Sequence, residues 1–146
     1  MTEKFNIRVY GILKHTNGNY LLTDECRGGV NMTKFVGGGL EFNEGLEDAL
    51  KREFIEEMNL KIEVKHLVYI NDFFQASKFN PKDQLLSVYY SVETNDWDRV
   101  EACIENPTKV QSFRWVDLKS MTVDEITFPI DKIVFNKIRL EPDTVL

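Results

Sequence analysis

The stretch GGLEFNEGLEDALKREFIEEMNL, residues 38–60, decides the interpretation of this chain. Its apolar residues recur at a spacing of three to four, which predicts an amphipathic helix from Leu46 to Met58. On a helical wheel of about 100° per residue, the apolar residues cover a stripe of about 120°. These residues are Leu46, Leu50, Phe54 and Met58. The sequence therefore predicts a helix that packs on a core by one face.

Three carboxylates gather beside this apolar stripe. Glu53, Glu56 and Glu57 are three or four residues apart, so their Cβ atoms lie about 5–6 Å from one another on a helix. Each close pair of negative charges costs roughly 3 kcal/mol at an effective dielectric of about 20. The wheel turns Glu53 and Glu57 toward the protein body, which favours a site for an oxygen-binding divalent cation. The alternative is an ordinary solvated face of a charged helix.

The spacing of the fixed residues in this stretch resembles the Nudix box, G-x5-E-x7-R-E-U-x-E-E-x-G-U, where U is a bulky aliphatic residue. The matching residues are Gly38, Glu44, Arg52, Glu53, Glu56, Glu57 and Leu60, and Phe54 fills the first bulky position. The chain is thus identified as a member of the Nudix hydrolase family. Such a motif is far more specific than a lone glycine pattern.

The departures from the box concern backbone conformation. Asn59 stands where the family has the glycine that ends the helix, and Asn43 stands where many members have glycine before Glu44. Asparagine is the residue after glycine that best tolerates the left-handed conformation. Gly45 is the expected N-cap of the helix, a position where glycine is acceptable. We therefore expect the geometry of the loop and helix to be retained.

The resemblance implies a metal-dependent hydrolase. Glu53, Glu56, Glu57 and the main-chain carbonyl of Gly38 are the expected ligands of Mg²⁺, with Mn²⁺ as a substitute. The resemblance makes Glu53 the leading candidate for the general base or a metal ligand. The catalytic set also contains Glu44 and Arg52. We expect Arg52 to orient Glu53 or to bind the glycine-rich segment, with Glu44 as its partner.

The implied reaction is attack of water on a diphosphate linkage in a nucleoside diphosphate joined to another moiety X, such as a nucleotide sugar, ADP-ribose or a nucleoside triphosphate. Candidate substrate-binding residues are Arg8, Arg27, Lys34 and Gly39. An additional carboxylate at Glu101 or Glu105 is left open. Several aromatic side chains could stack on a base, although packing in a core or interface is the commoner role of such residues. They are Phe73, Phe74, Phe79, Tyr89 and Tyr90.

Composition agrees with a chain that forms one domain over residues 1–146 and resides in the cytoplasm. The formal net charge of −6 and the pI of about 5.0 oppose stable binding to nucleic acids or membranes. Bound cations would still allow such a protein to bind polyphosphate. Two thiols, Cys26 and Cys103, suggest no disulfide framework. No apolar run approaches the length of a membrane span.

The remaining pattern predicts an α+β fold, an αβα sandwich with a Nudix-like mixed β-sheet flanked by helices. Predicted strands are Ile7 to Lys14, Tyr20 to Thr23, Met32 to Val36, Lys61 to Asp72, Leu86 to Val92 and Ser112 to Val116. A second helix is expected from Phe128 to Ile138, because Pro129 suits the first helical position. The segments Asp24 to Val30 and Ala76 to Gln84 are predicted as loops that carry specificity, and Gly37 to Gly39 as a turn.

Two other functions stay open at this point. A non-catalytic nucleotide- or metabolite-binding or sensing module could use the same fold, and a structural domain could leave the glutamates solvated. An exposed Ile55 on the acidic helix, together with surface aromatic residues, is compatible with a homodimer.

Overall fold

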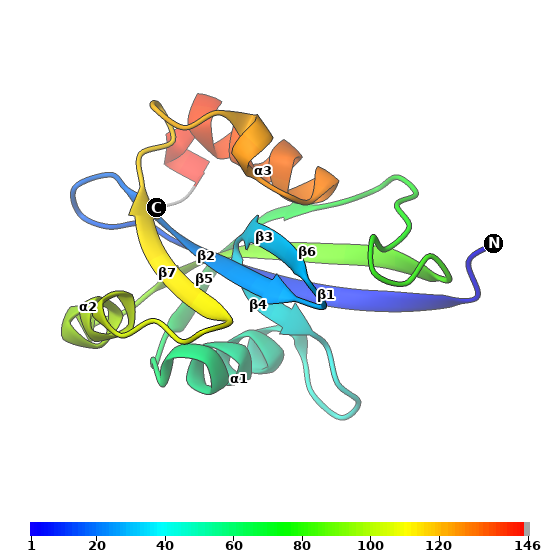
Figure 1. The fold of residues 1–146 in the computed structure, drawn as a ribbon, viewed down its shortest axis with the longest axis horizontal. Coiled ribbons are helices and arrows are strands. Elements are labelled where there is room, and N and C mark those ends of the chain that lie inside the picture. Colours follow the sequence, from blue (N-terminus) through cyan, green and yellow to red (C-terminus); the bar gives the residue numbers. More distant parts are fainter. Residues whose placement is uncertain (145–146) are drawn as a thin grey trace.

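The computed structural model describes residues 1–144, which form two β-sheets with helices on both sides (Figure 1). One sheet has four strands in the order β4 (Val36–Gly39), β1 (Lys4–Leu13), β6 (Asp83–Glu93) and β5 (Glu63–Ile70). The other has the order β3 (Val30–Lys34), β2 (Tyr20–Arg27) and β7 (Gln111–Val116). The helices are α1 (Leu46–Met58), α2 (Trp97–Glu105) and α3 (Pro129–Leu140), with short 3₁₀ turns η1 (Val123–Glu125) and η2 (Pro142–Thr144).

The four-stranded sheet is mixed. Strands β1 and β6 run parallel, whereas β4 pairs antiparallel with β1 and β5 pairs antiparallel with β6. The pairing of β1 with β4 sets Arg8 opposite Gly39 and Val9 opposite Gly38. This register places the glycine-rich strand at the edge of the sheet, beside the helix that follows it.

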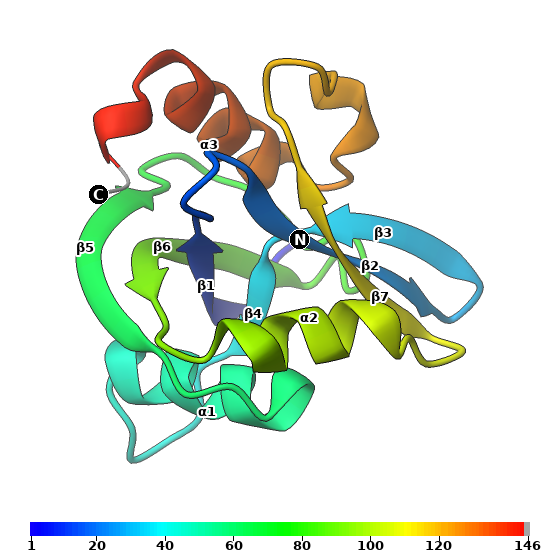
Figure 2. The same cartoon turned by 90° about the vertical axis from the view of Figure 1, so that its left-hand side faces the viewer.

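Helices cover the strands from two sides. Helix α3 lies on one side, and α1 and α2 lie on the other in both views (Figure 1; Figure 2). Phe135 of α3 belongs to a buried cluster with Tyr89 of β6, whereas Leu50 and Phe54 of α1 belong to a second buried cluster with Val9 of β1. The α+β sandwich with a mixed sheet is therefore confirmed. No helix in residues 1–144 is long and apolar enough to cross a membrane.

Helix α1 begins and ends at the predicted residues. Gly45 is its N-cap, and Asn59 after its last turn adopts φ 49° and ψ 39°. The Asn59 amide donates to the carbonyl of Ile55 at 2.9 Å, which satisfies a carbonyl of the final turn. Asn43 also has a positive φ, 70°. Both asparagines thus supply the left-handed conformation that glycine provides elsewhere.

The glycine run from Gly37 to Gly39 was predicted as a turn, and this prediction is wrong, because it forms part of strand β4. Its backbone groups pair with those of β1. The lack of side chains allows close packing of the backbone here and does not serve to reverse the direction of the chain. At Gly37, where φ is 156°, an added Cβ would lie 2.1 Å from the carbonyl oxygen of Val9. Glycine is required here by backbone contact.

The segment from Asp24 to Val30 was predicted as a loop, and this is also wrong. Strand β2 continues to Arg27 and β3 starts at Val30, so only Gly28 and Gly29 connect them, with φ of 56° and 77°. Two residues with positive φ are typical of a tight β-hairpin. Polar residues concealed the strand because this end of the hairpin extends past the buried core. Helix α2 was not predicted.

We expect Asn59→Ala to lower the free energy of unfolding by about 1 kcal/mol, because alanine disfavours the left-handed conformation. Asn59→Gly should leave it within about 0.5 kcal/mol of the wild-type value, since glycine tolerates that conformation but loses more backbone entropy on folding. Urea denaturation of the three proteins measures both effects. An alanine variant as stable as the glycine variant would contradict the conformational argument.

Candidate active site

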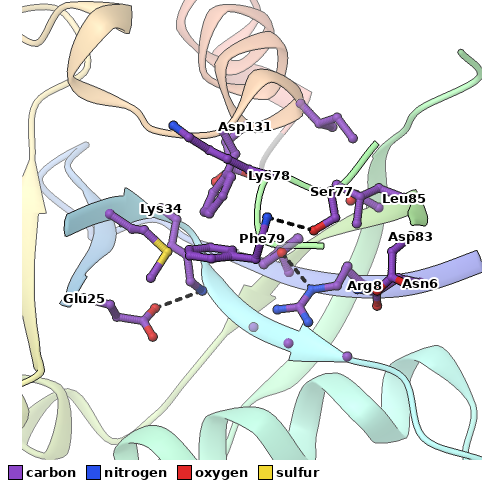
Figure 3. Close-up of a pocket in the computed structure, with 18 of the residues that line it drawn as sticks. Asn6, Arg8, Glu25, Lys34, Ser77, Lys78, Phe79, Asp83, Leu85 and Asp131 are labelled. Atoms are coloured by element: carbon purple, nitrogen blue, oxygen red, sulfur yellow. Dashed lines mark hydrogen bonds and ion pairs between the residues drawn. The ribbon is translucent and has the colours of Figure 1, made fainter. Parts of the chain in front are cut away.

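A cavity of about 530 Å³ lies between the two sheets and the ends of α1 and α3. Its volume is within the usual range for small-molecule sites. Glu53 and Glu57 reach it from α1, and the glycines of β4 form part of its wall. Figure 3 shows Arg8, Lys34 and Glu25 on one side of the cavity and Asp131 on the other. Acidic and basic groups thus share one cavity.

Arg52 joins the acidic residues of α1 to the preceding strand and loop. Its Nε and Nη2 donate to the two carboxylate oxygens of Glu44 at 3.0 and 2.7 Å, and Nη2 also donates to the Gly39 carbonyl at 2.9 Å. Nη1 donates to Glu53 at 3.0 Å and to Glu56 at 3.3 Å. The predicted contacts of Arg52 with Glu44 and Glu53 are therefore present. The same bonds lower the pKa of Glu44 below its ordinary value.

Arg52 also alters the sequence-based interpretation of the cluster formed by the three carboxylates. One guanidinium contacts two of the three clustered carboxylates, so a bound cation is not the sole source of positive charge near them. The Glu56 side chain is 56% exposed and stays on Arg52, while those of Glu53 and Glu57 line the cavity. The three carboxylates thus occupy different environments.

Glu53 lies tightly against Gly38. A Cβ added to Gly38 would come within 2.3 to 2.6 Å of the three carboxylate atoms of Glu53. Such contacts are shorter than any that a real Cβ makes, so the carboxylate would have to move. Strand β4 therefore sets the position of the Glu53 carboxylate from one side, and Arg52 holds it from the other.

Glu57 is the least satisfied carboxylate of the cavity. Its Oε1 accepts a hydrogen bond from Gln111 Nε2 at 2.7 Å, and its buried Oε2 has no hydrogen-bond partner within the described residues. Burial raises the pKa of Glu57 to about 7, although Lys34 and Gln111 act in the opposite direction. A buried, acceptor-only oxygen is suited to a divalent cation.

The residues of the cavity fit a divalent metal ion only in part. Within residues 1–144, no group of three or more His, Cys, Asp or Glu side chains is arranged closely enough to hold an ion. The donor chemistry nevertheless fits Mg²⁺ at two positions, Glu53 and Glu57, because both present carboxylate oxygens to the cavity. In the described part of the chain, Glu56 is not among the residues that line it, and its carboxylate forms an ion pair with Arg52.

Lys34 provides a buried positive charge. Its ammonium lies 3.1 Å from Glu25 Oε2, donates to the Phe35 carbonyl at 3.1 Å and sits 5.3 Å from the centre of the Tyr10 ring. Burial alone would lower the pKa of Lys34, but Tyr10, Glu25 and Glu57 outweigh it and raise the pKa. Lys34 therefore stays charged at neutral pH.

The two predicted arginines line the same cavity as this lysine. Arg8 donates from Nε to the Tyr10 hydroxyl at 3.1 Å, and the Arg27 guanidinium lies 5.4 Å from the centre of the Phe79 ring. The structure brings all four predicted substrate-binding residues, Arg8, Arg27, Lys34 and Gly39, to the wall of the same cavity.

Several further polar residues of the cavity were not predicted, among them Glu25, Gln111 and Asp131. Each belongs to a segment remote from the box, and no local pattern marks them. Glu101 accepts a hydrogen bond from Trp115 Nε1 at 2.8 Å on α2. In the described part of the chain, neither Glu101 nor Glu105 is among the residues that line this cavity.

A family model, the NUDIX domain, matches residues 4–136. The chain belongs to the Nudix family. Its fold is shared by a Nudix hydrolase from Nitrosomonas europaea, with a TM-score of 0.72, 19% identity, and coverage of 94% of this chain and 90% of that one. A MutT protein from Methanosarcina mazei Go1 gives a TM-score of 0.70 at 15% identity, with 97% and 98% covered.

An ADP-ribose pyrophosphatase from Streptococcus suis 89-1591 has a TM-score of 0.56 at 16% identity, with 92% of this chain and 87% of that one covered. Such low identities show a common fold. Family membership indicates a pyrophosphohydrolase.

Gly38→Ala should displace the Glu53 carboxylate, because the added methyl group occupies its place. We expect at least a tenfold loss in the affinity for Mg²⁺, measured as the rise in melting temperature with added ion. Gly39→Ala is the matched comparison, since its Cβ would meet only Arg8 Nη1 at 3.5 Å. Equal stabilisation of both variants by Mg²⁺ would show that Gly38 does not position Glu53.

Glu57→Gln should stabilise the metal-free protein at alkaline pH. The pKa of Glu57 in the folded protein, about 7, lies above its ordinary value of 4.5, so the folded state binds the proton more tightly. The free energy of unfolding therefore falls as pH rises between these values. At pH 8 in EDTA the variant should exceed the wild type by roughly 2–3 kcal/mol, and by much less at pH 5.

Denaturation at both pH values measures this difference. Glu47→Gln, at an exposed position of α1, is the control for loss of a charge. A stability gap between Glu57→Gln and the wild type that is the same at pH 5 and pH 8 would refute the assigned burial effect.

Proposed function

We propose that this protein is a Mg²⁺-dependent hydrolase of a diphosphate linkage in a nucleoside diphosphate joined to another moiety X. Mn²⁺ is expected to replace Mg²⁺. The observation that carries the proposal is the single cavity in which Glu53 and the unsatisfied Glu57 face the basic residues Lys34 and Arg8. An anionic substrate and a cation would each find complementary charge there.

The proposed metal ligands are Glu53 and Glu57, with Glu56 and the Gly38 carbonyl as further candidates. When bound, the ion offsets charge on the phosphate oxygens and acidifies water. Arg52 acts as a positioning residue, because it ties Glu53 to Glu44 and to the Gly39 carbonyl. Lys34, Arg8 and Arg27 are proposed to bind phosphate oxygens, since lysine and arginine are strong donors to such groups.

The proposed reaction is displacement at phosphorus by water. The water oxygen forms a bond to one phosphorus of the linkage, and the bond from that phosphorus to the bridging oxygen breaks. Glu53 is proposed to accept the proton of the water, and the bridging oxygen leaves on the other phosphate. The products are a nucleoside monophosphate and phospho-X, or a nucleoside monophosphate and pyrophosphate when the substrate is a triphosphate.

Glu53→Gln should lower turnover by at least 10²-fold, because an amide neither accepts the proton nor binds the cation as a carboxylate does. The assay uses nucleotide sugars, ADP-ribose, dinucleoside polyphosphates and nucleoside triphosphates with Mg²⁺, and measures released phosphate species. Glu47→Gln on the same helix is the control. Near-normal rates in Glu53→Gln would refute the role of Glu53.

A second result of the same assay bears on the proposal as a whole. If the wild-type protein binds members of this panel but hydrolyses none of them with Mg²⁺ or Mn²⁺, the protein is a binding or sensing module and the hydrolase proposal fails.

A further inference from the structure

Among the described residues, the two most exposed phenylalanines line one open groove. Phe42 is 97% exposed and Phe5 is 73% exposed. The groove has a volume of about 420 Å³, and its other apolar walls are the partly buried side chains of Ile7 and Leu40. Single exposed apolar side chains are common on protein surfaces, whereas large ones that gather in one place mark interaction sites. The proposed hydrolysis uses neither phenylalanine.

The phenylalanine groove lies on the face of β1 opposite the candidate active site. Side chains alternate along a strand, so Phe5 points to the same side as Val9, which packs against α1, while Arg8 points to the cavity. Helix α1 buries Val9 completely but leaves Phe5 uncovered. Figure 1 shows the loop between β4 and α1, which carries Phe42, projecting from the molecule on the side where β1 begins. The groove therefore occupies the uncovered end of this sheet face.

A free strand edge borders the groove. Strand β1 pairs with β6 from Lys4 to Leu13, but on its other edge β4 covers only Arg8 to Gly11. The Leu40 amide extends this cover by one bond, to the Ile7 carbonyl at 2.9 Å. Among residues 1–144, no backbone group pairs with Phe5 on that edge. An open edge of this kind is a template for pairing with a further strand.

The charges at the rim favour a second copy of this chain as the partner. Lys4 and Glu41 both line the groove, and their side chains are 70% and 68% exposed. A two-fold axis brings a residue of one copy against a different residue of the other copy, and the reverse contact forms as well. Lys4 of each copy can then meet Glu41 of the other. A surface with one sign of charge would instead fit a partner of the opposite sign.

We propose that this face joins two copies of the chain in a two-fold symmetric dimer. The free edges of β1 pair antiparallel, and Phe5 and Phe42 of both copies pack together in the groove. A fully buried aromatic side chain removes about 150–250 Å² from solvent, so the four partly exposed rings account for roughly 500–800 Å² of the ~1,200 Å² that a stable interface buries. The paired strand edges and the loop that carries Phe42 supply the rest.

Sedimentation velocity of the full chain over a range of concentrations tests the dimer. We expect the wild type to sediment mainly as a dimer at about 100 µM, since interfaces of this size reach micromolar affinity or better. Phe42→Asp and Phe5→Asp should each raise the dissociation constant by about tenfold or more, because each places a charge among apolar side chains.

Ile55→Asp is the matched control, since Ile55 was the residue through which the sequence suggested a dimer. Ile55 is 48% exposed on α1, and it is not among the described residues that line the groove. The dissociation constant of this variant should equal that of the wild type. A dimer that Ile55→Asp dissociates, and that Phe42→Asp and Phe5→Asp leave unchanged, would overturn the proposed surface.

An exchange of charges tests the identity of the partner. Lys4→Glu should weaken the dimer, because it places two acidic groups together, and Lys4→Glu combined with Glu41→Lys should restore it, because opposite charges then face each other again in both contacts. A double variant that associates as weakly as Lys4→Glu alone would contradict a second copy as the partner.

A wild type that stays monomeric at about 100 µM, a concentration at which a micromolar dimer is mostly formed, would also overturn the inference. Circular dichroism and melting temperatures of the variants verify that they are folded, and the exposure of Phe5 and Phe42 keeps these substitutions out of the core. The measurement needs neither metal nor substrate, so its failure is distinguishable from a failure of the proposed hydrolysis.

Discussion

The arrangement of this site depends on the bonds that one guanidinium makes to both sides of a helix–strand junction. Arg52 contacts Glu44 in the loop before α1, Glu53 on the helix and the carbonyl of Gly39 in β4. These charge-assisted bonds are stronger and more directional than neutral ones. Because they tie α1 to the edge of the sheet, Glu53 and Glu57 line the cavity while Glu56 stays on Arg52, despite the mutual repulsion of these carboxylates.

The cavity brings together acidic and basic groups, each of which would be energetically unfavourable to bury alone. Lys34 is nearly inaccessible to solvent, yet Glu25 and Tyr10 contact it and Glu57 adds a favourable field. Glu57, in contrast, retains a buried oxygen without a partner. Buried charges are tolerated when they are paired. A buried carboxylate without a partner has a raised pKa or binds a cation. This pairing of buried charges explains how basic side chains can line a cavity in a chain with a net charge of −6.

Much of the fold followed from local patterns, and the errors have physical causes. The limits of α1 were predicted because its apolar spacing, its glycine N-cap and Asn59 all act within one helix. The glycines of β4 were misassigned because glycine permits turns and close strand packing alike. Only the outer end of the β2–β3 hairpin, from Asp24 to Val30, was wrongly predicted as a loop, because charged residues continue along strands that extend beyond the core.

The sequence by itself determined the acidic helix, its end at Asn59 and the identity of the residues that Arg52 would contact, since all of these lie within about twenty residues. Tertiary structure alone brought Gln111 to Glu57, which are 54 positions apart, and placed Lys34, Glu25 and Asp131 around one cavity. Helical periodicity depends on residues that are close together in the sequence, so the sequence alone reveals it. The composition of a cavity depends on strand order and on the packing of distant elements, which no local spacing encodes.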